Sequence, residues 1–80
     1  MHPYMKKLYV FLGTIDDPVA DSIDESIIDL FCHPFGHLTD EYRRGLLMGM
    51  CSALTIVLND KGGDFNAVSL WHAYVDHYAD

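Results

Sequence analysis

The chain has 80 residues, half of them apolar and 21% charged, and twelve acidic against five basic side chains give a formal net charge of −7. This length suits one small domain (1–80) that buries about 60–65% of its unfolded surface, and the apolar content excludes intrinsic disorder. The shortage of Lys and Arg argues against direct binding of nucleic acid or anionic membranes. Two cysteines are too few for a disulfide scaffold. We therefore expect a compact, acidic protein of the cytoplasm.

The first segment, 3–12, carries two competing signals. Tyr4, Leu8 and Phe11 have the spacing of one helix face, whereas the run from Tyr9 to Phe11 favours a strand. A lone strand needs a pairing partner, and the one other candidate is 55–58. We therefore expect a helix here, with a strand as the alternative.

Neither a targeting segment nor a membrane span is expected. Lys6 and Lys7 precede an apolar run of five residues, whereas a secretory signal needs about 7–15. The longest apolar stretch, 45–58, falls short of the ~20 residues that cross a bilayer. It is more typical of a buried helix.

Capping and periodicity predict three further helices. Asp17 and Pro18 suit the start of the second, Thr39 caps the third (39–58), and Asp64 or Asn66 caps the last. The predicted buried stripes are Val19, Ile23, Ile27, Leu30 and Phe31; Tyr42, Leu46, Met50, Leu54, Val57 and Leu58; and Val68, Trp71, Val75 and Tyr78. The third helix is apolar nearly all round, so the predicted fold is an all-α bundle around it.

A row of acids marks the second helix. Asp17, Asp21, Glu25 and Asp29 recur every four residues, and Asp24 lies alongside. Like charges at this spacing destabilise a helix by a few tenths of a kcal/mol per pair. The row is either a solvated face or an electronegative surface that meets a basic partner. Cation binding is a third alternative, but no EF-hand loop pattern is present.

Two polar clusters could support chemistry. Cys32, His33 and His37, with Cys51, offer metal ligands, but the paired cysteine spacing of structural zinc sites is missing, so no metal is expected. His72 and Asp76, with His77 beside them, could orient a base toward Cys51 or Ser69. No nucleophile elbow or phosphate-binding loop accompanies them. We therefore expect no enzyme and no cofactor.

The third helix contains a row of small residues, Gly45, Gly49 and Ala53. Glycine inside a helix costs about 1 kcal/mol relative to alanine, so the row needs a packing reason. That reason is either a close crossing with another helix of the same chain or the seam of a homodimer.

Five aromatic residues exceed what one small core can hold, and those left exposed could mark a binding surface. They are Tyr4, Tyr9, Phe35, Phe65 and Tyr74.

The stretch 39–50 resembles helices of small phage and prophage accessory proteins, which combine an acidic-Tyr-Arg-x-Gly start with a glycine four residues on. Here these residues are Glu41, Tyr42, Arg43, Gly45 and Gly49. The resemblance implies an inhibitor of host machinery, such as an anti-CRISPR protein, acting in the host cytoplasm. No catalytic residue is carried over with it.

Two functions from different classes follow. The first is a non-enzymatic binding protein whose acidic helix covers the basic, nucleic-acid-binding surface of a host protein or nucleoprotein complex. The second is a structural or regulatory helical homodimer in which the acids only keep the protein soluble.

Overall fold

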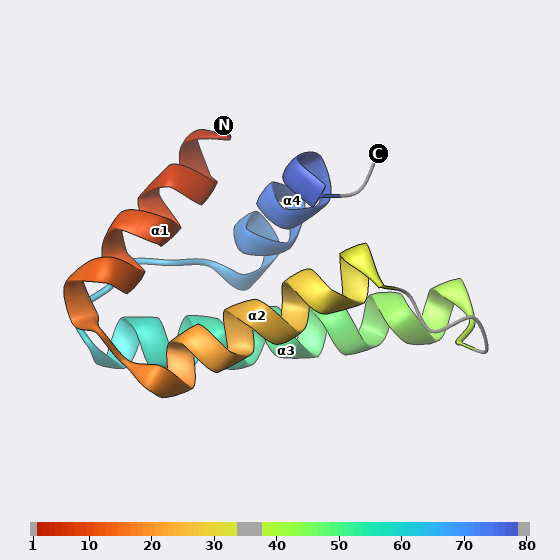
Figure 1. Ribbon diagram of the computed structural model, residues 1–80, viewed down its shortest axis with the longest axis horizontal. Helices are drawn as coiled ribbons and strands as arrows, with labels where there is room; N and C mark the ends of the chain where they lie inside the picture. Colours follow the sequence, from red (N-terminus) through yellow and green to blue (C-terminus); the bar gives the residue numbers. More distant parts are fainter. Residues whose placement is uncertain (1, 34–37, 79–80) are drawn as a thin grey trace.

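The computed structural model describes residues 2–33 and 38–78, and within them it contains four helices and no strand (Figure 1). The helices are α1 (Pro3–Ile15), α2 (Pro18–Cys32), α3 (Asp40–Asp60) and α4 (Ala67–Tyr78). The predicted all-α class is confirmed. The first segment is a helix rather than a strand, and α3 continues two residues beyond the predicted end.

The helices form two layers (Figure 1). α2 and α3 run antiparallel, side by side, while α1 and α4 both lie on one side of this pair. α4 contacts each of the other three helices, and α1 packs mainly on α4. The opposite side of the α2–α3 pair carries no helix of the described chain. α3, the longest helix, is therefore enclosed on one side and open on the other.

The predicted helix caps are confirmed. The Asp17 carboxylate accepts hydrogen bonds from the first-turn backbone of α2, and the Thr39 hydroxyl accepts one from Tyr42 N at 3.1 Å. Of the two candidates for α4, Asn66 is the cap, because its side chain accepts from Ser69 N at 3.1 Å. Capping depends on neighbouring residues alone, so the sequence predicts it well.

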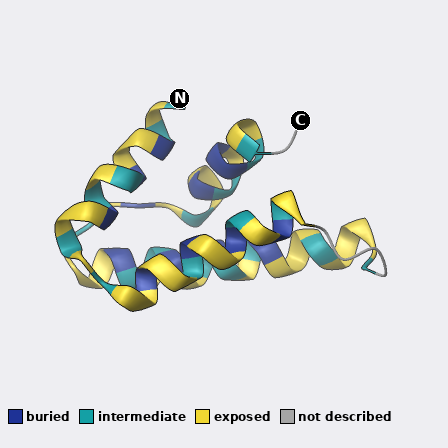
Figure 2. Ribbon diagram, viewed as in Figure 1, coloured by how far each residue is buried: buried dark blue, intermediate teal, exposed yellow. Residues whose placement is uncertain are grey.

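The buried faces differ from the predicted stripes (Figure 2). In α2, Ala20 and Asp24 are buried while Val19 is 59% exposed. In α4, Leu70, Ala73 and Tyr74 are buried while Val68 is exposed. In α3 the buried stripe is Leu47, Cys51, Leu54 and Leu58, and it leaves Tyr42 and Leu46 exposed. Because α3 is apolar nearly all round, its periodicity could not show which side faces the core.

The α3–α4 connection is anchored to α1. The Asn59 side chain donates to Phe65 O and accepts from Phe65 N, and Phe65 is buried. Its ring lies 5.8 Å from that of Tyr4 and 5.4 Å from that of Phe11. Lys7 Nζ donates to Asp64 O at 2.7 Å. The prediction that the core cannot hold all five aromatic residues is wrong for the four that are described, because Phe65 and Tyr74 lie in the core and Tyr4 and Tyr9 pack against it. Phe35 lies outside the described residues.

Candidate functional site

The exposed face of α2 carries three of the predicted acids. Asp21, Glu25 and Asp29 are all exposed and follow one another every four residues, about 6 Å apart along the helix axis. Within the described chain neither Asp21 nor Glu25 has an ion-pair partner. Asp29 lies 3.8 Å from Nδ1 of His33, and both side chains are exposed. These three acids are called the acidic face below.

Asp17, the first acid of the row, has a structural role. Its Oδ1 accepts from Val19 N at 2.9 Å and from Ala20 N at 3.4 Å, and its Oδ2 lies 3.9 Å from Lys61 Nζ. The side chain is 15% exposed. Asp17 is therefore the N-cap of α2, in contact with the end of α3, and offers little of its charge to a partner.

Replacing Asp17 by Ala should lower the free energy of unfolding by about 1 kcal/mol, because two backbone N–H groups lose their acceptor. Asp17→Asn should retain nearly all of the stability, since Asn caps as well as Asp. Urea unfolding followed by circular dichroism measures both. An Ala variant as stable as the parent would contradict the cap.

Asp24 does not belong to the acidic face. It is 7% exposed, and its Oδ1 accepts a hydrogen bond from the Tyr74 hydroxyl at 2.5 Å. Burial raises the pKa of Asp24, and the negative charges of Asp21 and Glu25 raise it further, whereas the bond from Tyr74 opposes this. The prediction that Asp24 binds a partner is corrected, because its carboxyl group faces α4.

Asp24 is part of a polar and aromatic cluster between three helices. Tyr9 of α1 and Tyr78 of α4 share a hydroxyl–hydroxyl hydrogen bond, and the Phe31 ring stacks 6.4 Å from those of Tyr74 and Tyr78. Burial is the main cause of the raised pKa values of Tyr9 and Tyr74, so both phenols stay protonated. The cluster joins α1, α2 and α4.

The sequence signal for this cluster was the position of Asp24. It lies four residues after Ala20 and three before Ile27, and both are buried. Spacing of three and four residues places all three on one helix face. The row of acids predicts a charged role for Asp24, whereas its spacing from Ala20 and Ile27 places it on the apolar face.

The two cysteines lie in different surroundings. Cys32 is exposed at the end of α2, whereas Cys51 is fully buried in the core. Burial raises the pKa of the Cys51 thiol to about 12, which suppresses the reactive thiolate. His37 lies outside the described residues, and among those described no group of three or more His, Cys, Asp or Glu side chains could hold a metal ion.

The histidines of α4 form no catalytic arrangement with the residues considered. His72, His77 and Ser69 are exposed, and Asp76 lies 3.5 Å from Nε2 of His2, the N-cap of α1. Cys51 is on the buried side of α3. The possible base, His72, is therefore exposed, whereas the possible thiol nucleophile, Cys51, is buried in the core.

Gly45, Gly49 and Ala53 are all exposed on α3. Among the described residues, a Cβ atom added at Gly45 or Gly49 would have nothing beyond the adjacent backbone of α3 within 4 Å. The prediction that this row allows a close crossing with another helix of the same chain is wrong. The cost of glycine in a helix, about 1 kcal/mol relative to alanine, has no compensation within the described chain.

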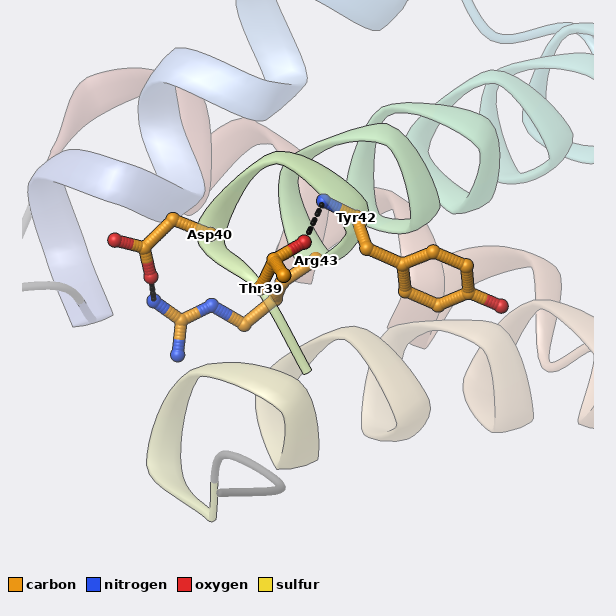
Figure 3. Close-up of polar contacts among 4 residues, drawn as sticks. All are labelled: Thr39, Asp40, Tyr42 and Arg43. Carbon is orange, nitrogen blue, oxygen red and sulfur yellow. Dashed lines mark hydrogen bonds and ion pairs between the residues drawn. The ribbon is translucent and has the colours of Figure 1, made fainter. Parts of the chain in front are cut away.

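The two arginines border a hollow that the sequence did not predict. It has a volume of about 470 Å³ and is lined by Phe31, Asp40, Arg43, Arg44, Leu47, Trp71, Val75 and Tyr78. Arg43 Nη2 donates to Asp40 Oδ1 at 3.2 Å, and Figure 3 shows this pair on one side of the first turn of α3 with Tyr42 on the other. This pair reduces the positive charge that Arg43 could offer to a ligand.

Comparisons with known proteins give no further guide. No protein-family model matches the chain, and no curated protein and no solved structure matches it either. Among the described helices, none is both long enough and apolar enough to cross a membrane.

Proposed function

We propose that this protein acts by binding, without catalysis, and that the acidic face of α2 covers a basic surface on a partner protein. The observation that carries the proposal is the exposed row of Asp21, Glu25 and Asp29, in which two of the three acids lack a cationic neighbour among the described residues. The absence of a thiolate or base in a catalytic arrangement in the described part supports binding over chemistry.

The energetic argument rests on charge. Three like charges on successive turns of one helix destabilise it slightly, so the arrangement brings no benefit to the isolated chain. A partner with Lys and Arg side chains converts the repulsion into attraction. Complementary charge mainly raises the association rate and selects the partner. Nucleic acid is excluded as the direct ligand of this face because phosphate carries the same sign.

In its finer form, the proposed partner is a host protein or nucleoprotein complex whose basic surface binds nucleic acid. The protein would then be an inhibitor encoded by a phage or another mobile element, acting in the host cytoplasm. This form depends on the resemblance of 39–50 to phage accessory proteins and on the negative charge that the acidic face shares with nucleic acid.

The test reverses the acidic face. The triple variant Asp21→Lys, Glu25→Lys and Asp29→Lys should lose salt-sensitive binding to an Arg- and Lys-rich peptide. In a pull-down from bacterial lysate, it should no longer capture the proteins that the parent captures. The matched control carries the same reversals at Glu41, Asp64 and Asp76, which are exposed on other elements. Both variants have the same net charge, so the comparison separates a specific face from overall acidity.

Binding by the parent should also weaken as salt rises, because exposed charges are screened beyond about 8–10 Å at ~0.1–0.15 M. Calorimetry or fluorescence anisotropy with the labelled peptide gives the affinities. Equal losses in both variants would show that only net charge matters. Full retention of binding by the α2 variant would place the working surface elsewhere.

Self-association is the second candidate function, and one observation favours it. Gly45, Gly49 and Ala53 lie on an open side of α3 that no other described helix covers. A helical homodimer would use this side and leave Asp21 and Glu25 free, whereas Asp29 lines the hollow beside Leu46.

A further inference from the structure

α3 carries a second apolar stripe that the described chain leaves uncovered. Its members recur at alternating spacings of four and three residues, and all of them are exposed: Tyr42, Leu46, Gly49, Ala53 and Ile56. Tyr42 is 62% exposed, Leu46 40% and Ile56 71%. Alternation of four and three is the spacing by which one helix packs along another. We call this set the outer stripe of α3.

The outer stripe belongs to a broader open side. Two hollows of about 390 and 400 Å³ lie between α2 and α3, and no residue of α1 or α4 lines either of them. Met50 lines both, Ala53 the first and Leu46 the second. In Figure 1, α1 and α4 cover only the other side of the α2–α3 pair, and in Figure 2 exposed residues follow the uncovered edges of both helices.

We propose that a second copy of this chain covers the outer stripe, with the two α3 helices antiparallel across a two-fold axis at Gly49. The pattern is self-complementary about that residue. Tyr42 lies seven residues before Gly49 and Ile56 seven residues after it, so Tyr42 of one copy would face Ile56 of the other. Leu46 and Ala53 lie three before and four after, so a large side chain would face a small one. Gly49 would face itself and allow close approach of the backbones.

A two-fold interface requires a self-complementary pattern, because the same patch must serve both partners. With each copy contributing an antiparallel α2–α3 pair, the product is a four-helix bundle flanked by α1 and α4 on its outer sides. A standard protein–protein interface buries about 800 Å² of accessible surface on each partner, which is about a sixth of the 4955 Å² accessible surface of this chain. The stripe itself is about 21 Å long, within a molecule 37 Å in its longest dimension.

Most of the acidic face lies outside the proposed dimer interface. Asp21 and Glu25 line neither hollow beside the outer stripe, whereas Asp29 lines the second one. The copies carry the same charge of −7, so salt should strengthen their association by screening repulsion. Binding to a basic partner should instead weaken with salt. Failure of one proposal can therefore be distinguished from failure of the other.

The experiment measures mass by sedimentation equilibrium over a concentration series. The parent should reach twice the chain mass, and Ile56→Glu or Gly49→Leu should raise the dimer dissociation constant at least about tenfold. Both should stay folded by circular dichroism, because Ile56 is exposed and a Cβ at Gly49 has room. Val68→Glu, an exposed apolar-to-acid change on α4, is the matched control and should stay dimeric.

Disulfide trapping tests the register in a Cys32→Ser background. Gly49→Cys should cross-link to itself, because a two-fold axis brings position 49 within the 4.4–6.8 Å that a disulfide requires between Cα atoms. Tyr42→Cys alone should not cross-link, but mixed with Ile56→Cys it should form heterodimers. A parent that is monomeric up to millimolar concentration, an unaffected dimer in Ile56→Glu, or self-cross-linking of Tyr42→Cys would each overturn the proposal.

Discussion

Replacing Tyr74 by Phe should lower the free energy of unfolding by about 1–3 kcal/mol, because the buried carboxyl group of Asp24 loses its described hydrogen-bond donor. For a domain of this size, each kcal/mol corresponds to a fall of about 4–8 °C in Tm. Thermal and urea unfolding followed by circular dichroism measure the change. Tyr42→Phe is the matched control, because Tyr42 is 62% exposed and should lose no stability. Equal stability of both variants would show that the Tyr74–Asp24 bond contributes nothing.

The burial of Asp24 should give the protein a dependence on pH that Asp24→Asn reduces. Burial raises the pKa of Asp24 above its ordinary 3.8, so the folded state holds the proton more tightly than the unfolded chain. The stability from this group is fully present below pH 3.8 and is lost as pH rises through the raised pKa. Asn can still accept from Tyr74 but carries no charge.

The free energy of unfolding of Asp24→Asn, relative to the parent, should therefore increase as pH rises from about 3.8 toward neutrality. Urea unfolding at a series of pH values measures this difference. The slope is the decisive quantity, because any fixed cost of burying the amide is independent of pH. A difference that stays constant, or falls as pH rises, would contradict the raised pKa.

The sequence predicted the helices better than their orientation. Asp17, Thr39 and Asn66 mark helix starts through hydrogen bonds to their own next turns, so their signals are local. The helix in 3–12 was favoured because a lone strand would lack a partner, and α1 instead packs mainly on α4. These features need no knowledge of how distant elements pack.

Which face of each helix is buried depends on distant elements. α3 has apolar residues both on its core side, such as Leu54, and on its open side, such as Ile56. Periodicity could not choose between them, and the predicted stripe combined residues from both. The burial of Asp24 likewise depends on Tyr74, which is fifty residues away along the chain. Of the five acids predicted to meet a partner, Asp24 is withdrawn by this distant contact and Asp17 by its local role as the N-cap of α2.

Gly63 in the α3–α4 turn has a role in packing as well as in ending α3. Gly63 N donates to Leu58 O at 2.9 Å, which closes the end of α3. A Cβ at Gly63 would lie 2.8 Å from Leu58 O and 3.0 and 3.1 Å from the rings of Phe65 and Phe11. The glycine is therefore required first by the close approach of Leu58 O at the end of α3, and the packed rings of Phe65 and of Phe11 in α1 add to the requirement.

Gly63→Ala should accordingly destabilise the protein by about 1–3 kcal/mol, because the added methyl group meets a backbone carbonyl that cannot easily move and two packed rings. Gly13→Ala is the matched control. Gly13 lies in α1, where an added Cβ has nothing within 4 Å among the described neighbours, so the change should stabilise by about 0.5–1 kcal/mol. Thermal unfolding of the two variants should therefore shift Tm in opposite directions. A Gly63→Ala variant that melts at or above the parent's temperature would contradict the close approach of Leu58 O and the two rings to Gly63.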